Sequence, residues 1–120
     1  MDENRSGVGE LTPAAFKRRL ESGEPLAVLD VREDHEREFA TIPLPPTAVD
    51  LHVPIGWVST RLSEIAGVAL GRTLVIYCHH GVRSMAAATW LLGRGFASVQ
   101  NLEGGIDAWS RRVDASVPRY

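Results

Sequence analysis

Short apolar runs that alternate with helix-like segments are the feature of this chain that most constrains its fold. The clearest runs cover residues 26–31 and 73–77, and a further short strand is predicted near residues 98–102. A nearly continuous apolar run of this length is typical of a strand that is covered on both faces of a parallel sheet. Strands separated by helices pair in parallel through right-handed crossovers. The pattern therefore predicts an α/β fold in which a central, mostly parallel sheet carries helices on both faces.

The expected helices follow from local signals. Thr12 suits an N-cap and Pro13 the first helical position, so a helix should begin there and end at Ser22 and Gly23. The other predicted helices cover residues 34–39, residues 55–65 with Gly67 as the terminator, residues 84–92, and a last segment containing Ile106 and Trp109. A brief extended piece is predicted near residues 48–51, after a proline-rich loop.

The length of the chain limits the number of domains. With 120 residues, 44% of them hydrophobic, the chain can bury one ordinary core and is too short for two comfortable domains. We expect residues 11–120 to form a single domain. Residues 1–10 are polar and contain glycine, so we expect them to be a flexible, frayed lead-in.

Charge and cysteine content narrow the partners and the compartment. The net charge is -2 with acids and bases interspersed, which predicts no nucleic-acid surface and no membrane-binding patch. The start of the chain lacks the apolar core of a signal peptide, and no run approaches the roughly 20 apolar residues of a membrane span. A single cysteine excludes an internal disulfide and suits a reducing compartment. We therefore expect a cytoplasmic protein whose partners are small molecules or proteins.

Cys78 lies at the junction between the predicted strand 73–77 and the predicted helix 84–92. Four residues separate Cys78 from Arg83, so the backbone can wrap a small cup with its N–H groups pointing inward, and Gly81 permits the turn. Arg83 should add a positive charge at the rim, and Ser84 should cap the helix that follows. Such an anion cradle should stabilise a reactive thiolate and hold a negatively charged group on the sulfur.

Three segments of the chain resemble a known family, the single-domain rhodaneses or thiosulfate sulfurtransferases. They are the loop Cys78-His79-His80-Gly81-Val82-Arg83-Ser84, the segment Val28-Leu29-Asp30-Val31-Arg32-Glu33, and the segment Leu102-Glu103-Gly104-Gly105-Ile106-Asp107-Ala108-Trp109. They occur in the family's order and at family-like separations. The resemblance implies a rhodanese-like three-layer α/β fold over residues 11–120.

The resemblance also implies an activity. The Cys78 thiolate would take a sulfane sulfur from a donor such as thiosulfate, form a persulfide, and pass the sulfur to a nucleophilic acceptor, which can be a protein, as can the donor. The substrate-binding loop would comprise His79, His80, Gly81, Val82, Arg83 and Ser84 around Cys78. Asp30 and Arg32 are expected to be a paired, structural framework near this loop. No metal and no organic cofactor is expected, because adjacent histidines beside one cysteine lack the separated ligand pairs of a structural zinc site.

Other functions fit parts of the same pattern. A persulfide carrier that reacts poorly with thiosulfate would have the same loop, and a non-catalytic protein-binding module would keep the fold but tends to lose the nucleophile. Cys-dependent phosphatases and arsenate reductases also place a thiolate and an arginine in an anion cradle. Their loops have five residues between the two, whereas this chain has four, which predicts a cup better suited to one sulfur atom than to a tetrahedral oxyanion.

Overall fold

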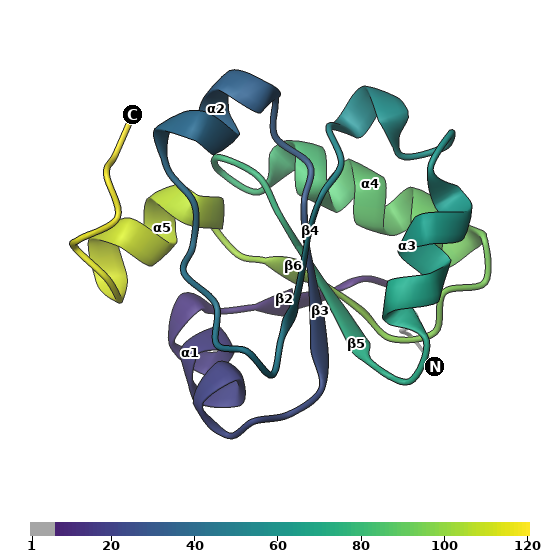
Figure 1. Ribbon diagram of the computed structural model, residues 1–120, viewed down its shortest axis with the longest axis horizontal. Coiled ribbons are helices and arrows are strands. Elements are labelled where there is room, and N and C mark those ends of the chain that lie inside the picture. The colour runs from purple at the N-terminus through teal and green to yellow at the C-terminus, as the bar shows by residue number, and fades with distance from the viewer. Residues whose placement is uncertain (1–6) are drawn as a thin grey trace.

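Five parallel strands form the middle layer of the structure, a computed structural model that describes residues 7–120 (Figure 1). In sheet order they are β2 (Gly9–Leu11), β6 (Val99–Leu102), β5 (Thr73–Tyr77), β3 (Leu26–Asp30) and β4 (Val49–His52). Every pairing between neighbouring strands is parallel. The α/β class and the parallel sheet predicted from the sequence are confirmed.

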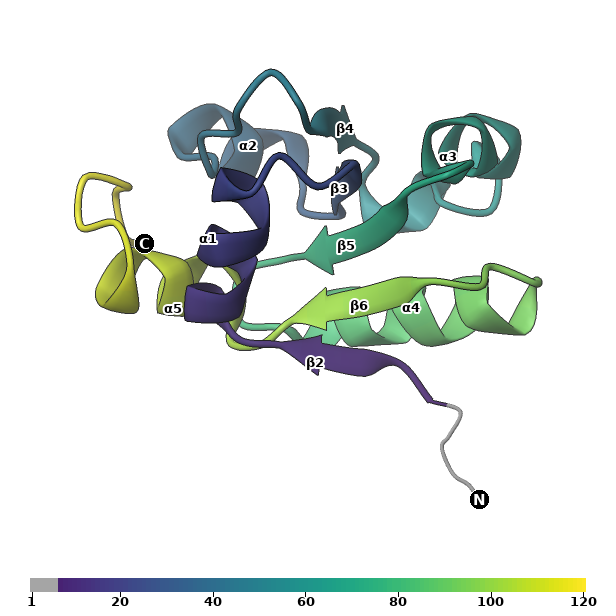
Figure 2. The same ribbon diagram turned by 90° about the horizontal axis from the view of Figure 1, so that it is seen from below.

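Helices cover both faces of this sheet, as Figure 1 and Figure 2 show from two directions. The helices α1 (Pro13–Glu21) and α5 (Gly105–Arg112) pack together on one face, and α3 (Leu62–Ala69) and α4 (Val82–Gly93) lie on the other. The short helix α2 (Asp34–Phe39) follows β3, and a 3₁₀ turn, η1 (Ile55–Trp57), follows β4. The predicted three layers are therefore present.

Alternation along the strands explains why the sheet needs both layers of helices. Consecutive strand residues point to opposite faces, so an apolar run feeds two cores. In β3, Val28 packs in the cluster that contains Phe16 of α1, whereas Leu29 packs in the cluster that contains Leu91 of α4. All four side chains are fully buried. The nearly continuous apolar run 26–31 thus has a direct structural reason.

The predicted start of the first helix is also confirmed. The Thr12 side chain accepts a hydrogen bond from the Ala15 N–H at 3.1 Å, and Pro13 occupies the first helical position. This hydrogen bond satisfies one of the N–H groups that have no partner inside the helix.

The beginning of the chain differs from the expectation. Gly9 and Glu10, which we assigned to a frayed lead-in, belong to β2 and pair in parallel with Gln100 and Asn101 of β6. A three-residue strand that contains glycine has too little apolar alternation to be found from the sequence. Residues 1–6 of the expected lead-in lie outside the described residues.

Two helix boundaries also differ. The helix predicted over residues 55–65 is divided into η1 and α3, and Gly67 lies inside α3, which ends before Gly71 with φ of +75°. The helix predicted from Ser84 begins instead at Val82, because Gly81 adopts the left-handed conformation (φ 101°) at the N-cap. Ser84 is therefore a residue of α4 and not its cap.

The carboxyl ends of the parallel strands meet at one edge of the sheet, where ligands bind in folds of this kind. Cys78 directly follows β5 at that edge. Among residues 7–120, none of the helices has the length and apolar character that crossing a membrane requires.

Candidate active site

The loop after β5 surrounds the Cys78 sulfur with hydrogen-bond donors. The backbone N–H groups of Gly81 and Ser84 point at Sγ, with N···S distances of 3.2 and 3.4 Å. The Ser84 hydroxyl oxygen lies 3.3 Å from the same sulfur. Cys78 is 1% exposed. The loop therefore places the only thiol of the chain at the bottom of a narrow cup, beside the start of α4.

The start of α5 orients this loop. The N–H groups of Ile106 and Asp107 donate to the carbonyl oxygens of Cys78 and His79, at 2.9 and 3.0 Å. Because the C=O and N–H of one peptide point in opposite directions, these two bonds turn the N–H groups of His79 and His80 away from α5. A Cβ atom on Gly105 would collide with these two carbonyl oxygens, so glycine at this position allows α5 to approach the loop backbone.

Arg83 is engaged by a partner that the sequence analysis did not include. Its guanidinium forms two hydrogen bonds with the Glu36 carboxylate, at 2.7 and 2.9 Å, and the Tyr120 hydroxyl donates to the same carboxylate at 2.9 Å. We expected Arg83 to add a positive charge at the rim of the cup. In the structure that charge is balanced by Glu36, because α2 places this carboxylate directly opposite α4.

This ion pair lowers the pKa of Glu36 to about 2, chiefly through the hydrogen bonds from Arg83. The ordinary value is 4.5, so Glu36 binds its proton more weakly in the folded chain than in the unfolded chain. The contribution of Glu36 to the free energy of unfolding is therefore fully present above about pH 4.5 and is lost as the pH falls through about 2.

We expect Glu36→Gln to lower the free energy of unfolding at neutral pH by about 3 kcal/mol, because glutamine cannot offer Arg83 a charge. The difference from the unchanged protein should shrink as the pH falls below about 4.5. Urea unfolding across a pH series measures it. Glu38→Gln is the matched control, because Glu38 is exposed on the same helix and should change little. A difference that stayed constant down to pH 2 would contradict the assignment.

Asp30 and Arg32 form a second ion pair beside the loop. The Arg32 Nε and Nη2 atoms donate to the two Asp30 oxygens at 2.9 and 2.8 Å, and neither side chain has any exposed surface. Arg32 also donates to the Ala40 carbonyl at 2.7 Å and to the Tyr120 hydroxyl at 2.9 Å. Through these contacts Arg32 joins the end of β3 to the segment after α2 and to Tyr120.

The two histidines of the loop have different surroundings. The His79 ring stacks on Tyr120, with ring centres 3.8 Å apart, and the ring of His80 lies tilted beside it, with ring centres 3.9 Å apart. Burial, followed by the charge of His80, lowers the pKa of His79. The His80 side chain is largely exposed, and its Nε2 lies 4.0 Å from an Asp107 oxygen.

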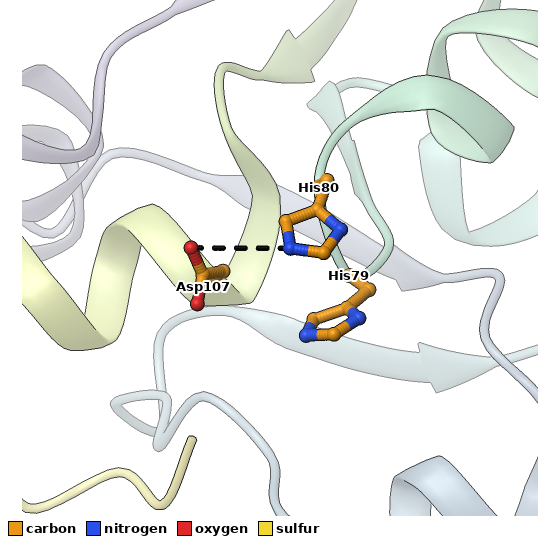
Figure 3. A group of neighbouring side chains, drawn as sticks. All are labelled: His79, His80 and Asp107. Atoms are coloured by element: carbon orange, nitrogen blue, oxygen red, sulfur yellow. Dashed lines mark ion pairs between the residues drawn. The ribbon is translucent and has the colours of Figure 1, made fainter. Parts of the chain in front are cut away.

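His79, His80 and Asp107 are drawn in Figure 3 because their ligand-type atoms all lie within 4.8 Å of one another. Such a group has the chemistry to hold a metal ion. However, Arg111 and Arg119 already donate to the Asp107 carboxylate at 2.9 and 3.3 Å, and they bring two positive charges to this place. The cluster therefore fits an ion-pair network better than a metal site.

The structure places Gly81 and Ser84 of the predicted loop against the Cys78 sulfur, whereas the Val82 side chain is exposed. It also shows four residues near the loop that the sequence analysis missed. The added residues are Glu10, Glu36, Asn101 and Tyr120. Asn101 is a polar residue in a predicted strand next to β5, but Gln100 beside it is polar too, so only the tertiary structure singles it out. Glu10, Glu36 and Tyr120 are ordinary surface residue types in the sequence, and only the tertiary structure places them near the loop.

Comparisons with known proteins identify the family of this chain. The family model for the rhodanese-like domain matches residues 12–112. A protein of Allochromatium vinosum named sulfurtransferase is 35% identical over 104 residues, which cover 87% of this chain and 90% of that protein. YrkF of Bacillus subtilis is 36% identical over 112 residues, which cover 93% of this chain and 56% of YrkF.

A solved structure shares the fold. The rhodanese-like domain protein from Staphylococcus aureus superposes with a TM-score of 0.73 at 26% sequence identity, covering 94% of this chain and 99% of that one. The match of the family model extends from the N-cap of α1 to the last residue of α5, and so includes every strand of the sheet except β2. This chain belongs to the family of rhodanese-like domains.

Proposed function

We propose that this domain is a sulfurtransferase that moves a sulfane sulfur from a donor to a nucleophilic acceptor through a persulfide on Cys78. The observation that carries the proposal is the position of Sγ, which lies within reach of the Gly81 and Ser84 N–H groups at the bottom of the loop. The Allochromatium vinosum protein named sulfurtransferase, which is 35% identical to this chain, also supports it.

The first half-reaction would be the uptake of sulfur. The Cys78 thiolate attacks the outer sulfur of the donor, a sulfur–sulfur bond forms, and the leaving group departs with the electrons of the broken bond. With thiosulfate the leaving group is sulfite, and with a small persulfide it is a thiolate. The terminal sulfur of the new persulfide carries the negative charge, which inward-directed N–H groups stabilise as they do in an oxyanion hole.

The second half-reaction would return the enzyme to its starting state. A nucleophile such as cyanide or a thiolate attacks the terminal sulfur, and the electrons of the sulfur–sulfur bond return to Sγ. No metal or organic cofactor is required for either step, because the charge moves only between sulfur atoms and the attacking nucleophile.

A sulfur carrier that prefers a persulfide donor is the second candidate. The pairing of Arg83 with Glu36 supports it, since an arginine with a balanced charge attracts a doubly charged donor such as thiosulfate less strongly than a free one. YrkF, whose name is that of a sulfur carrier, also supports it.

We expect the intact protein to gain the mass of one sulfur atom when it is incubated with thiosulfate or glutathione persulfide. Cyanide should remove that mass and yield thiocyanate. The Cys78→Ser variant keeps a side chain of similar size without the nucleophile, so it should gain nothing. Intact-mass spectrometry measures the uptake, and the relative rates with the two donors separate the two candidates. If the unchanged protein gains no sulfur from either donor, the proposal is wrong.

A further inference from the structure

A network of hydrogen-bonded polar groups leads from Glu10, at the edge of the sheet, to the reactive sulfur. The Asn101 amide nitrogen donates to the Glu10 carboxylate at 3.0 Å and to the Gly81 carbonyl at 3.3 Å. The Asn101 carbonyl oxygen lies 2.6 Å from the Ser84 hydroxyl, which lies 3.3 Å from the Cys78 sulfur. Ser84 has no exposed surface and Asn101 is 2% exposed. The network thus connects β2, β6, α4 and the loop.

The groups at the Glu10 end of this network fix the direction of each hydrogen bond in it. An ionised carboxylate and a backbone carbonyl can only accept, so the group of Asn101 that faces Glu10 and Gly81 must be its NH₂ group. The other end of the amide is then a carbonyl oxygen, which also can only accept. The hydroxyl hydrogen of Ser84 must therefore point at Asn101, and an oxygen lone pair of Ser84 is left facing Cys78.

We propose that the Ser84 hydroxyl oxygen accepts a hydrogen bond from the S–H group of the resting Cys78 thiol. We also propose that Asn101 is a positioning residue that keeps the Ser84 hydroxyl hydrogen away from the sulfur. A lone pair directed at Sγ favours the S–H form over the thiolate. The hydroxyl can turn to a thiolate only by leaving the Asn101 oxygen without its donor in a buried place, which is unfavourable. The inference rests on the proposed function only in treating Cys78 as the reacting residue.

This arrangement affects the thiolate and the persulfide differently. In the thiolate the charge lies on Sγ, directly opposite the Ser84 lone pair. In the persulfide the charge lies on the terminal sulfur, one bond further away, and Sγ is neutral. Sulfur uptake would therefore relieve an unfavourable contact, so Asn101 and Ser84 together would shift the balance from the free thiolate toward the sulfur-loaded form.

The direction in which the midpoint of Cys78 ionisation moves in one variant tests the proposal. In Ser84→Ala the acceptor for the thiol proton is gone, so the pH at which half of Cys78 is ionised should fall by roughly half to one unit. If the hydroxyl instead donated to the thiolate, the same substitution would raise that midpoint. The ultraviolet absorbance of the thiolate across a pH series gives the midpoint, with Cys78→Ser as the blank that removes the tyrosine signal. A raised or unchanged midpoint would overturn the proposal.

Other charged groups around the loop stay the same in this comparison. They are Glu10 on β2, Arg32 after β3, Glu36 on α2, Arg83 on α4, Asp107 on α5, and the loop histidines beside Tyr120. Alanine at position 84 removes a neutral hydroxyl and adds no charge. A shift of the midpoint therefore reports the hydroxyl and not a change in the local field.

The role of Asn101 is tested by a double-mutant cycle. Asn101→Leu frees the Ser84 hydroxyl to turn to the sulfur, so it should also lower the midpoint, whereas adding it to Ser84→Ala should cause no further shift. An equal shift with and without the hydroxyl would mean that the loop had moved, and would overturn the positioning role. Asn101→Ala serves in the same cycle if leucine is too large for the fold.

The measurement is independent of sulfur transfer. Ionisation of Cys78 can be followed whether or not the protein accepts sulfur from a donor. If the midpoint falls in Ser84→Ala but no donor loads the unchanged protein, the proposed function is wrong and the inference about Ser84 and Asn101 stands. If sulfur is loaded but the midpoint rises, the reverse holds.

Discussion

Replacing Asp30 with alanine should lower the free energy of unfolding by about 3–5 kcal/mol, because it leaves a buried arginine charge without its partner. Arg32 has no exposed surface, and Asp30 accepts two hydrogen bonds from its guanidinium and one from its backbone N–H. The remaining partners of Arg32 are neutral oxygens of the backbone and of Tyr120, which cannot balance the charge.

Urea unfolding followed by circular dichroism measures this effect. Glu21→Ala is the matched control, because it also removes an acid that pairs with a basic side chain, here Lys17, but at a site where both side chains are more than half exposed. The control should change stability by no more than about 0.5 kcal/mol. Equal losses in the two variants would show that the buried pair contributes no more than a surface pair does.

The second large effect is expected for Gly105→Ala, which should both destabilise the fold and disturb the loop. A Cβ atom at this position would lie 2.5 Å from the Cys78 carbonyl oxygen and closer still to that of His79, and the backbone φ is +63°. The left-handed conformation alone costs roughly 1–2 kcal/mol for a residue with a side chain. Relief of the contacts would push α5 away from the loop, so we expect sulfur uptake by Cys78 to be lost or greatly slowed.

Gly67→Ala is the control for this substitution. Gly67 lies in α3 with no heavy atom within 4 Å of the added Cβ, so alanine there should be neutral or should stabilise the helix by up to about 1 kcal/mol. Intact-mass spectrometry of sulfur uptake and thermal unfolding are measured together for both variants. Gly105→Ala with unchanged uptake would contradict the orienting role of α5.

Local patterns in the sequence predicted most of the fold. The apolar run at residues 73–77 forms β5, the short strand predicted near residues 98–102 contains the whole of β6, and Thr12 with Pro13 marks the start of α1. These elements are determined by side-chain periodicity and by capping, which neighbouring residues encode. The strand β2 was missed because its stability comes from pairing with β6, at the other end of the chain.

The site was predictable in its loop and not in the surroundings of the loop. The spacing of Cys78, Gly81 and Arg83 indicated a cup of backbone N–H groups, and the Gly81 and Ser84 N–H groups indeed point at the sulfur. The partner of Arg83 could not be found, because Glu36 is one of many acids in the sequence and only the packing of α2 near α4 selects it. The capping role expected of Ser84 was wrong because Gly81 begins the helix two residues earlier.

The edge strand β2 also has a consequence for the order in which the protein folds. Glu10 and Asn101 are 91 positions apart in the chain, so their contact is among those that close the longest loops and form slowly. A growing chain that has reached Cys78 has neither β6 nor α5, and so it has neither Asn101 nor the N–H groups that hold the loop carbonyls. We therefore expect Cys78 to acquire its full set of surrounding contacts only when β2 has paired with β6. An unfinished chain would then not expose a preformed sulfur site.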